Sequence, residues 1–234
     1  MNLTLQDRLT AVEQRIAAAC ARSERDPSSV ALVAVSKTYP PEDVDSLARL
    51  GCKVFGESRI QEAAQKIPVC SSGLEWHGIG HLQRNKVPVA VELFSRLHGI
   101  DSLRLLERVE SCAAETGRTI QACLEVNVSG ESSKYGFTPE EVPAVLAFLP
   151  KLRYVNIDGL MTIAPFTPDP EDSREHFRRL RMLRDTWAAA SGWPLDVLSM
   201  GMSHDMEVAI EEGATMVRVG TALFGPRPKQ GEVA

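Results

Sequence analysis

Short apolar segments of strand length alternate with longer amphipathic segments along the whole chain, and this alternation limits the possible folds. The apolar segments span residues 30–36, 53–56, 74–80, 96–100, 120–128, 154–163, 195–200 and 215–220. Helical periodicity separates most of them, and strands separated by helices are typical of a parallel sheet. The order of elements therefore predicts an α/β fold with eight parallel strands.

Eight strand–helix units in 234 residues predict one closed (β/α)8 barrel of the TIM type. Leu5, Leu9, Val12 and Ile16 recur at helical spacing and predict an extra N-terminal helix over residues 3–24. A doubly wound open sheet is the structural alternative. No change in composition divides the chain, so we predict a single domain over 1–234 with a short tail at 226–234.

Composition excludes several classes of protein. Lys and Arg number 26 against 31 Asp and Glu, and this net charge of −5 lacks the electrostatic footprint of a nucleic-acid binder. No apolar run is long enough to span a membrane, and the early charges at Asp7 and Arg8 argue against a signal peptide. The five cysteines form no CxxC and no metal-ligand pattern. We expect a cytoplasmic protein without a metal site.

The first predicted strand ends directly at Lys37. In a barrel of this type the active site lies where strands end and the following loops begin. A lysine in a desolvated pocket has a lowered pKa and can form a Schiff base with a carbonyl group. The alternative is a lysine whose amine extends into solvent at the barrel rim.

The last two strands end in glycine- and hydroxyl-bearing loops. SMGMSHD (199–205) contains Gly201 and Ser203, and RVGTALFG (218–225) contains Gly220 and Thr221. Loops after strands seven and eight are the recurrent phosphate site of these barrels. Each pair taken alone could be an ordinary helix N-cap.

Arg218 lies within the eighth predicted strand, two residues before Gly220. If it points into the barrel, its permanent charge needs an acceptor or an anion. A Schiff-base lysine, a phosphate site and an inward arginine together match the aldehyde, phosphate and ring nitrogen of pyridoxal 5′-phosphate. An arginine facing that nitrogen would keep it unprotonated and make the ring a poorer electron sink.

Two other features have simpler interpretations. His77 and His81 are four residues apart, but the strand pattern argues against a helical metal pair, and His77 is predicted to be a neutral histidine of the core or pocket wall. The arginines within residues 171–190 are predicted to form a solvated outer helix face.

Several motifs together resemble the pyridoxal phosphate homeostasis protein family, which is similar to the isolated N-terminal barrel of alanine racemase. The motifs are VAVSKTYP (33–40), FGESRIQEA (55–63), WHGIGHLQRNK (76–86), VNVSGESSKYGF (126–137), GLMTIAPF (159–166) and LSMGMSHDMEVAIEEGATMVRVGTALFG (198–225). They cover nearly the whole chain in the right order. The resemblance implies a fold-type III barrel without the C-terminal β domain of the racemase.

The resemblance also implies a set of cofactor-binding residues. Pyridoxal 5′-phosphate would form an internal aldimine with Lys37, and Arg218 would face its pyridine nitrogen. The remaining residues implied are Ser203, Gly220 and Thr221 at the phosphate, Met161, Met200, Gly201 and His77 around the pocket, and Ser58, where the family usually has Asn.

The function implied is a carrier or buffer of pyridoxal phosphate in vitamin B6 and amino-acid and keto-acid homeostasis, without robust catalysis. PLP-dependent apoenzymes are candidate partners, and a monomer is favoured. A racemase needs a second acid/base group, which the tail PRPKQGEVA cannot supply through an added domain.

Other functions have less support in the sequence. The alternative is a small-amino-acid racemase or lyase that uses Tyr39, Tyr135 or Lys134. A Schiff-base aldolase fits poorly because the sixth strand carries no lysine. A protein-interaction module explains neither Lys37 nor the two glycine loops.

Overall fold

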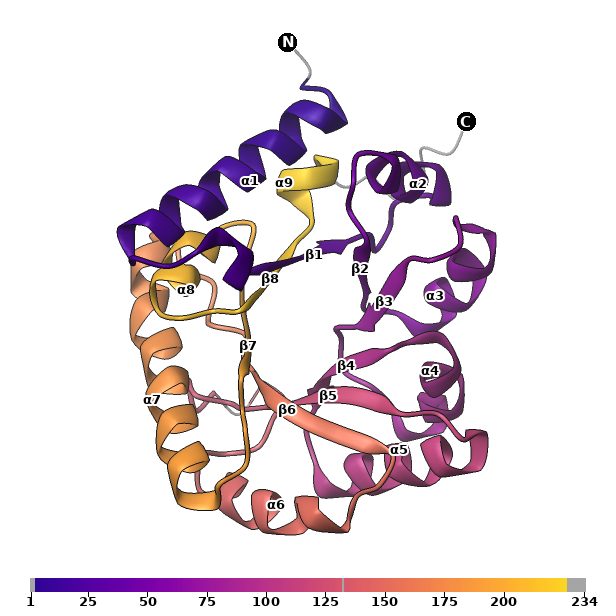
Figure 1. Ribbon diagram of the computed structural model, residues 1–234, viewed down its shortest axis with the longest axis vertical. Helices are drawn as coiled ribbons and strands as arrows, with labels where there is room; N and C mark the ends of the chain where they lie inside the picture. The colour runs from indigo at the N-terminus through magenta and orange to yellow at the C-terminus, as the bar shows by residue number, and fades with distance from the viewer. Residues whose placement is uncertain (1–2, 132, 227–234) are drawn as a thin grey trace.

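A computed structural model describes residues 3–131 and 133–226 of the chain. Eight parallel strands close into a barrel in sequence order, and the helices surround it (Figure 1). The strands are β1 (Ala31–Val35), β2 (Val54–Glu57), β3 (Glu75–Gly78), β4 (Arg96–Ile100), β5 (Ile120–Glu125), β6 (Val155–Met161), β7 (Val197–Met202) and β8 (Met216–Val219). The predicted (β/α)8 barrel is confirmed, and the open sheet is excluded.

The barrel closes where β1 pairs with β8, with Val33 opposite Arg218 and Ala34 opposite Val219. The surrounding helices are α1 (Leu5–Arg22), α2 (Pro41–Arg49), α3 (Ile60–Lys66), α4 (Val87–Leu93), α5 (Leu103–Thr116), α6 (Val142–Phe148), α7 (Arg174–Ser191), α8 (Met206–Glu211) and α9 (Thr221–Phe224). Short 3-10 turns lie at Pro27–Ser29, Ile67–Val69, Arg84–Lys86, Leu149–Lys151 and Pro170–Ser173.

Two helices have features that periodicity does not show. Helix α6 begins only at Val142, because a turn in which Glu141 N donates to Thr138 O (3.1 Å) precedes it. The short α9 after β8 was not predicted, since its four residues are too few to show a helical period. Most of the predicted tail, from residue 227 onward, lies outside the described residues.

The N-terminal helix α1 lies across α8 and α9, next to the loops that follow β7 and β8 (Figure 1). Arg15 of α1 forms a salt bridge with Glu207 of α8 (2.6 Å) and donates a hydrogen bond to Ser203 O (3.0 Å). The extra helix therefore supports the loop in which Ser203 lies.

The main apolar core lies between the strands and the helices, whereas the inside of the barrel is largely polar. The second apolar cluster is small and contains Val33, Val35 and Ile79, with Val54 packed against it. Arg96 and Asp158 form a bidentate salt bridge (2.6 and 2.7 Å) in which the arginine is buried. Residues on β3, β4, β7 and β8 complete this interior with hydrogen-bonded polar groups.

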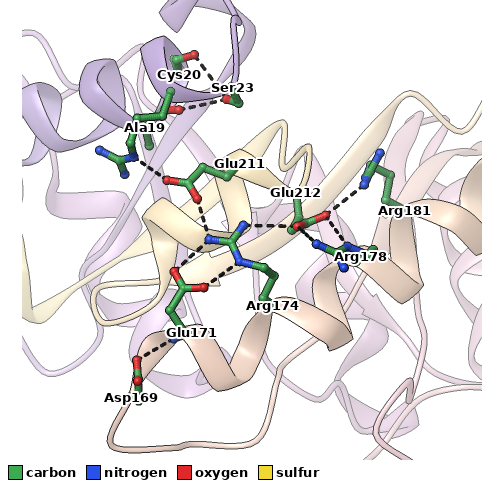
Figure 2. A network of polar contacts seen from close by, with 11 residues as sticks. Ala19, Cys20, Ser23, Asp169, Glu171, Arg174, Arg178, Arg181, Glu211 and Glu212 are labelled. Carbon is green, nitrogen blue, oxygen red and sulfur yellow. Dashed lines mark hydrogen bonds and ion pairs between the residues drawn. The ribbon is translucent and has the colours of Figure 1, made fainter.

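The sequence predicted a solvated outer face for the arginines of α7, but several of these arginines form salt bridges. Arg174, Arg178 and Arg181 form salt bridges with the carboxylate of Glu212 at 3.0–3.2 Å, and Arg174 also pairs with Glu211 and Glu171 (Figure 2). Glu211 belongs to α8 and Glu212 follows it, and their carboxylates offset the positive charges of these three arginines. This network joins α7 to α8 on the outer layer of the barrel.

Among the helices of residues 3–131 and 133–226, none has both the length and the apolar content needed to cross a bilayer. The same residues contain no cluster of three or more His, Cys, Asp or Glu side chains placed to hold a metal ion.

The carboxyl end of β7 requires a glycine at position 201. Gly201 has a φ of +90°, and a Cβ there would lie 2.5 Å from Ala209 Cβ. We expect Gly201→Ala to lower the free energy of unfolding by about 1–2 kcal/mol for the backbone conformation and by about 1–3 kcal/mol more for the collision. Urea denaturation would measure it.

Gly117→Ala is the matched control, because Gly117 has a φ of +66° but open space around its Cβ position. It should show the backbone cost alone. Equal losses in the two variants would mean that the contact with Ala209 has no effect.

Candidate functional site

The carboxyl ends of β1, β7 and β8 bring several predicted site residues to one mouth of the barrel. A Cβ on Gly220 would lie 3.3 Å from Val35 O, so the loop after β8 lies directly against the end of β1. Lys37, which is half-buried, follows two residues after Val35. The predicted lysine and the predicted glycine loop are therefore neighbours, although about 180 residues separate them in the sequence.

Backbone N–H groups converge on one point of this mouth. The N–H groups of Gly220 and Ala222 both donate to Ser203 Oγ, at 3.2 and 3.3 Å. Ser203 lies in the loop after β7, and Asp205 Oδ1 holds that loop by accepting from Met202 N (2.7 Å). Two N–H donors directed at one oxygen are a suitable arrangement for binding an anion.

Arg218 is buried, and its guanidinium reaches the ends of β6 and β7. It donates to Ser199 O (2.7 Å), Ser199 Oγ (2.6 Å) and Thr162 O (3.0 Å). Burial lowers the pKa of this guanidinium. In the part of the chain that the structure describes, it has no salt bridge with a carboxylate. The result is a desolvated cation bound only to neutral oxygens, which suits a neutral acceptor atom of a ligand.

A chain of side chains continues from Arg218 through the barrel interior. Ser199 Oγ lies 2.7 Å from His98 Nδ1, His98 Nε2 lies 3.0 Å from His77 Nδ1, and His77 Nε2 lies 3.0 Å from Glu75 Oε1. Burial lowers the pKa of both histidines, strongly so for His98. The sequence analysis predicted a neutral His77 but missed His98, which shares the inward positions of β4 with Arg96.

The other predicted residues lie around the mouth in different roles. Met161 ends β6 and is buried, whereas Met200 belongs to the main apolar core, so its side chain supports the pocket from the helix layer. Ser58 follows β2 and packs against Gly80, where a Cβ would lie 2.6 Å from Ser58 O. Thr221 begins α9 and is exposed.

Glu125 is a site residue that the sequence analysis missed. It ends β5, is 8% exposed, and borders a cavity of about 160 Å³ that Lys134, Tyr135 and Thr162 also line. Burial, with a contribution from the charge of Asp101, raises the pKa of its carboxyl to about 7. The predicted strand segment 120–128 continues past Glu125, whereas β5 ends at Glu125, so the signal that singled out Lys37 does not single out this carboxyl from the sequence. A larger hollow of about 780 Å³ lies along α7, lined by residues such as Arg178 and Met182 rather than by strand ends.

The residues proposed for racemase chemistry differ in their surroundings. Tyr39 is buried, donates its hydroxyl proton to Gly225 O (2.5 Å) and stacks on Phe224. Tyr135 is 57% exposed and stacks on His81 with ring centroids 3.7 Å apart. Lys134 Nζ donates to Ile163 O (3.2 Å). Tyr135 and Lys134 thus lie near Glu125, whereas the Tyr39 hydroxyl is already bonded.

Comparison with known proteins first defines the class. The family model described as the alanine racemase N-terminal domain matches residues 8–228. Among solved structures, alanine racemase of Clostridium difficile 630 superposes with a TM-score of 0.73 at 16% identity, over 96% of this chain and 57% of the racemase. The chain therefore has the barrel of the alanine racemase N-terminal domain.

More similar proteins define the family within that class. Pyridoxal phosphate homeostasis proteins of Aquifex aeolicus and Escherichia coli K12 are 43% and 39% identical; the alignments cover 94% of this chain and 97% and 95% of the relatives. PipY of Synechococcus elongatus PCC7942, solved with PLP bound, is 36% identical with a TM-score of 0.83, over 95% of this chain and 100% of PipY. The chain belongs to the pyridoxal phosphate homeostasis protein family.

The buried carboxyl of Glu125 predicts a pH-dependent stability. Its folded pKa of about 7 exceeds the ordinary value of 4.5, so the folded chain binds more protons than the unfolded chain between these pH values. Stability from this group is therefore lost as pH rises through that window, by at most about 3 kcal/mol. Glu125→Gln should match the wild type near pH 4 and be more stable at pH 8.

Chemical denaturation of both proteins from pH 4 to pH 8 measures this difference. Glu140→Gln, which changes an exposed glutamate in the same way, is the control. A Glu125→Gln curve parallel to that of the wild type would show that Glu125 ionises normally.

Proposed function

We propose that this protein holds pyridoxal 5′-phosphate at the barrel mouth through a Schiff base with Lys37, and acts as a carrier or buffer of that cofactor without robust catalysis. The observation that carries the proposal is Arg218, a buried cation whose hydrogen-bond acceptors among the described residues are neutral oxygens. It lies on the strand that pairs with β1 and leads to the N–H groups of Gly220 and Ala222. Family membership and the PLP-bound relative PipY support it.

The residues present fit the cofactor's functional groups. The N–H groups of Gly220 and Ala222, with the hydroxyls of Ser203 and Thr221, would hold the phosphate. Their convergence on Ser203 Oγ supports this assignment. Arg218 would donate to the ring nitrogen, and Ser58, His77, Met161, Met200 and Gly201 would line or support the pocket. Serine at position 58 has a shorter side chain than the asparagine usual in the family and no amide group, so the side-chain contact of that asparagine is not carried over to it.

When bound, pyridoxal phosphate supplies an aldehyde that condenses with amines and a ring that withdraws electrons. Lys37 would provide the amine, and the aldehyde oxygen would leave as water. Arg218 keeps its proton at physiological pH and cannot protonate the ring nitrogen. Hydrogen bonding without protonation limits electron withdrawal by the ring, which suits storage better than turnover.

The carrier role concerns the supply of the cofactor to other proteins. We infer that the chain exchanges pyridoxal phosphate with PLP-dependent apoenzymes, as a monomer, in the cytoplasm. Its five cysteines are free thiols, as expected in a reducing compartment. Because Lys37 is half-buried rather than fully buried, an acceptor enzyme or a free amine would have access to it.

Replacement of Lys37 tests the cofactor assignment. Wild-type protein incubated with pyridoxal phosphate should show a yellow absorption band that borohydride fixes covalently, and mass spectrometry should locate the adduct on Lys37. Lys37→Ala should lose the band and the adduct, whereas Lys53→Ala, which removes an exposed lysine next to β2, should keep both. A wild-type protein that takes up no pyridoxal phosphate would overturn the cofactor assignment.

A racemase or lyase is the second candidate, and the cavity lined by Glu125, Lys134 and Tyr135 is the observation that favours it. These groups could act as acids or bases near the cofactor. For a carrier we expect no steady, protein-dependent exchange of the α-proton of alanine in deuterated water, measured by NMR. Steady exchange that Glu125→Gln or Tyr135→Phe abolishes would instead establish the catalytic alternative.

A further inference from the structure

A buried cluster of three charged side chains lies against the loop that contains Lys37. Lys66, from the end of α3, is 5% exposed and donates three hydrogen bonds from its Nζ. The acceptors are Glu57 Oε1 (2.6 Å), Glu62 Oε1 (2.7 Å) and Ser36 O (2.8 Å). A lysine in this setting has all three ammonium protons in use and cannot turn toward solvent without breaking them.

The cluster holds the residues on both sides of Lys37. Ser36 donates its hydroxyl proton to Glu57 Oε1 (2.7 Å), and its carbonyl accepts from Lys66. Thr38 donates its backbone N–H to Glu62 Oε1 (2.6 Å). Elements β2 and α3 thus fix the chain immediately before and immediately after the lysine.

Thr38 shows that the loop depends on this restraint. Its φ is +71°, in the left-handed region that a β-branched residue rarely adopts. Its hydroxyl oxygen is also buried without a hydrogen-bond partner among the described residues. Strained backbone of this kind persists only where surrounding contacts hold it, and the bond to Glu62 is such a contact.

We propose that Glu62 and Lys66 are positioning residues for Lys37: by holding Ser36 and Thr38, they direct the lysine amine into the barrel mouth. This inference rests on the proposed role of Lys37. The amine must approach the aldehyde carbon closely, and a displacement of about 1 Å can slow a reaction by about a hundredfold. Among the described residues, the hydrogen bonds and salt bridges of the cluster go to its own members and to Ser36 and Thr38, not to the predicted phosphate loops after β7 and β8. Affinity for the phosphate end should therefore not depend on the cluster.

The test separates covalent attachment from non-covalent binding. The first probe is pyridoxal 5′-phosphate, with the rate constant of imine formation followed by absorbance. The second is pyridoxine 5′-phosphate, whose alcohol replaces the aldehyde and cannot form an imine. Glu62→Ala should slow imine formation by about ten- to a hundredfold, and the dissociation constant for pyridoxine 5′-phosphate should change less than twofold.

Two further variants sharpen the comparison. Glu62→Gln keeps an oxygen for Thr38 N and should recover most of the rate. Glu211→Ala removes a glutamate of α8 that accepts from Arg22 and Arg174 (Figure 2), and α8 lies across the barrel from α3 (Figure 1). This variant should leave the rate unchanged. If Glu62→Ala does not fold, the same replacement in a Thr38→Gly background relieves the left-handed strain and should still slow imine formation relative to Thr38→Gly alone.

The measured rates and affinities test the positioning role and the proposed function separately. A wild-type rate in Glu62→Ala, or an equal loss of affinity for pyridoxine 5′-phosphate, would overturn the positioning role. Failure of the wild-type protein to form an imine at all would instead overturn the proposed function, and would be seen before any variant is compared.

Discussion

The pairing of β1 with β8 is the constraint on which the site depends. It places Val33 opposite Arg218 and brings Val35 against Gly220, so the lysine loop at one end of the chain meets the glycine loop at the other. In an open sheet these two strands would be edges, and their loops would lie apart. Barrel closure therefore satisfies the backbone of both strands and assembles the mouth in the same step.

A polar barrel interior is costly unless its groups are hydrogen-bonded, and the arginines and histidines inside this barrel have such partners. Arg96 is paired with Asp158, and Arg218 is bound through Ser199 to a chain that includes His98 and ends at the half-exposed Glu75. Burial within this interior lowers the pKa of the histidines and raises that of Glu125. The same desolvation that shapes these pKa values keeps the Arg218 cation available for a ligand acceptor.

Local strain and close packing are concentrated around the mouth. Gly201 leaves no space for a side chain, and Thr38 adopts a left-handed conformation that Glu62 holds in place. Gly201 lies at the carboxyl end of β7 and Thr38 in the loop after β1, so both features lie next to a proposed ligand group. Rigid strands and strained loops together give the lysine and the N–H groups fixed positions, which reduces the ordering required when a ligand binds.

Periodicity alone was enough to predict the eight strands, the parallel barrel and the extra helix, because short segments rich in buried apolar residues alternate with segments of helical period. The positions of Lys37 and of the glycine loops followed from where those runs end. The sequence could not show that Met200 faces the helix layer, that His98 bonds to Ser199, or that Lys66 reaches Ser36. These contacts join residues from different strands and helices, and only the closed barrel brings them within hydrogen-bonding distance. The sequence pattern thus decides which residues reach the barrel mouth. Tertiary structure decides the hydrogen-bond partners and the charge states of those residues, because burial and hydrogen bonding depend on neighbours distant in the chain.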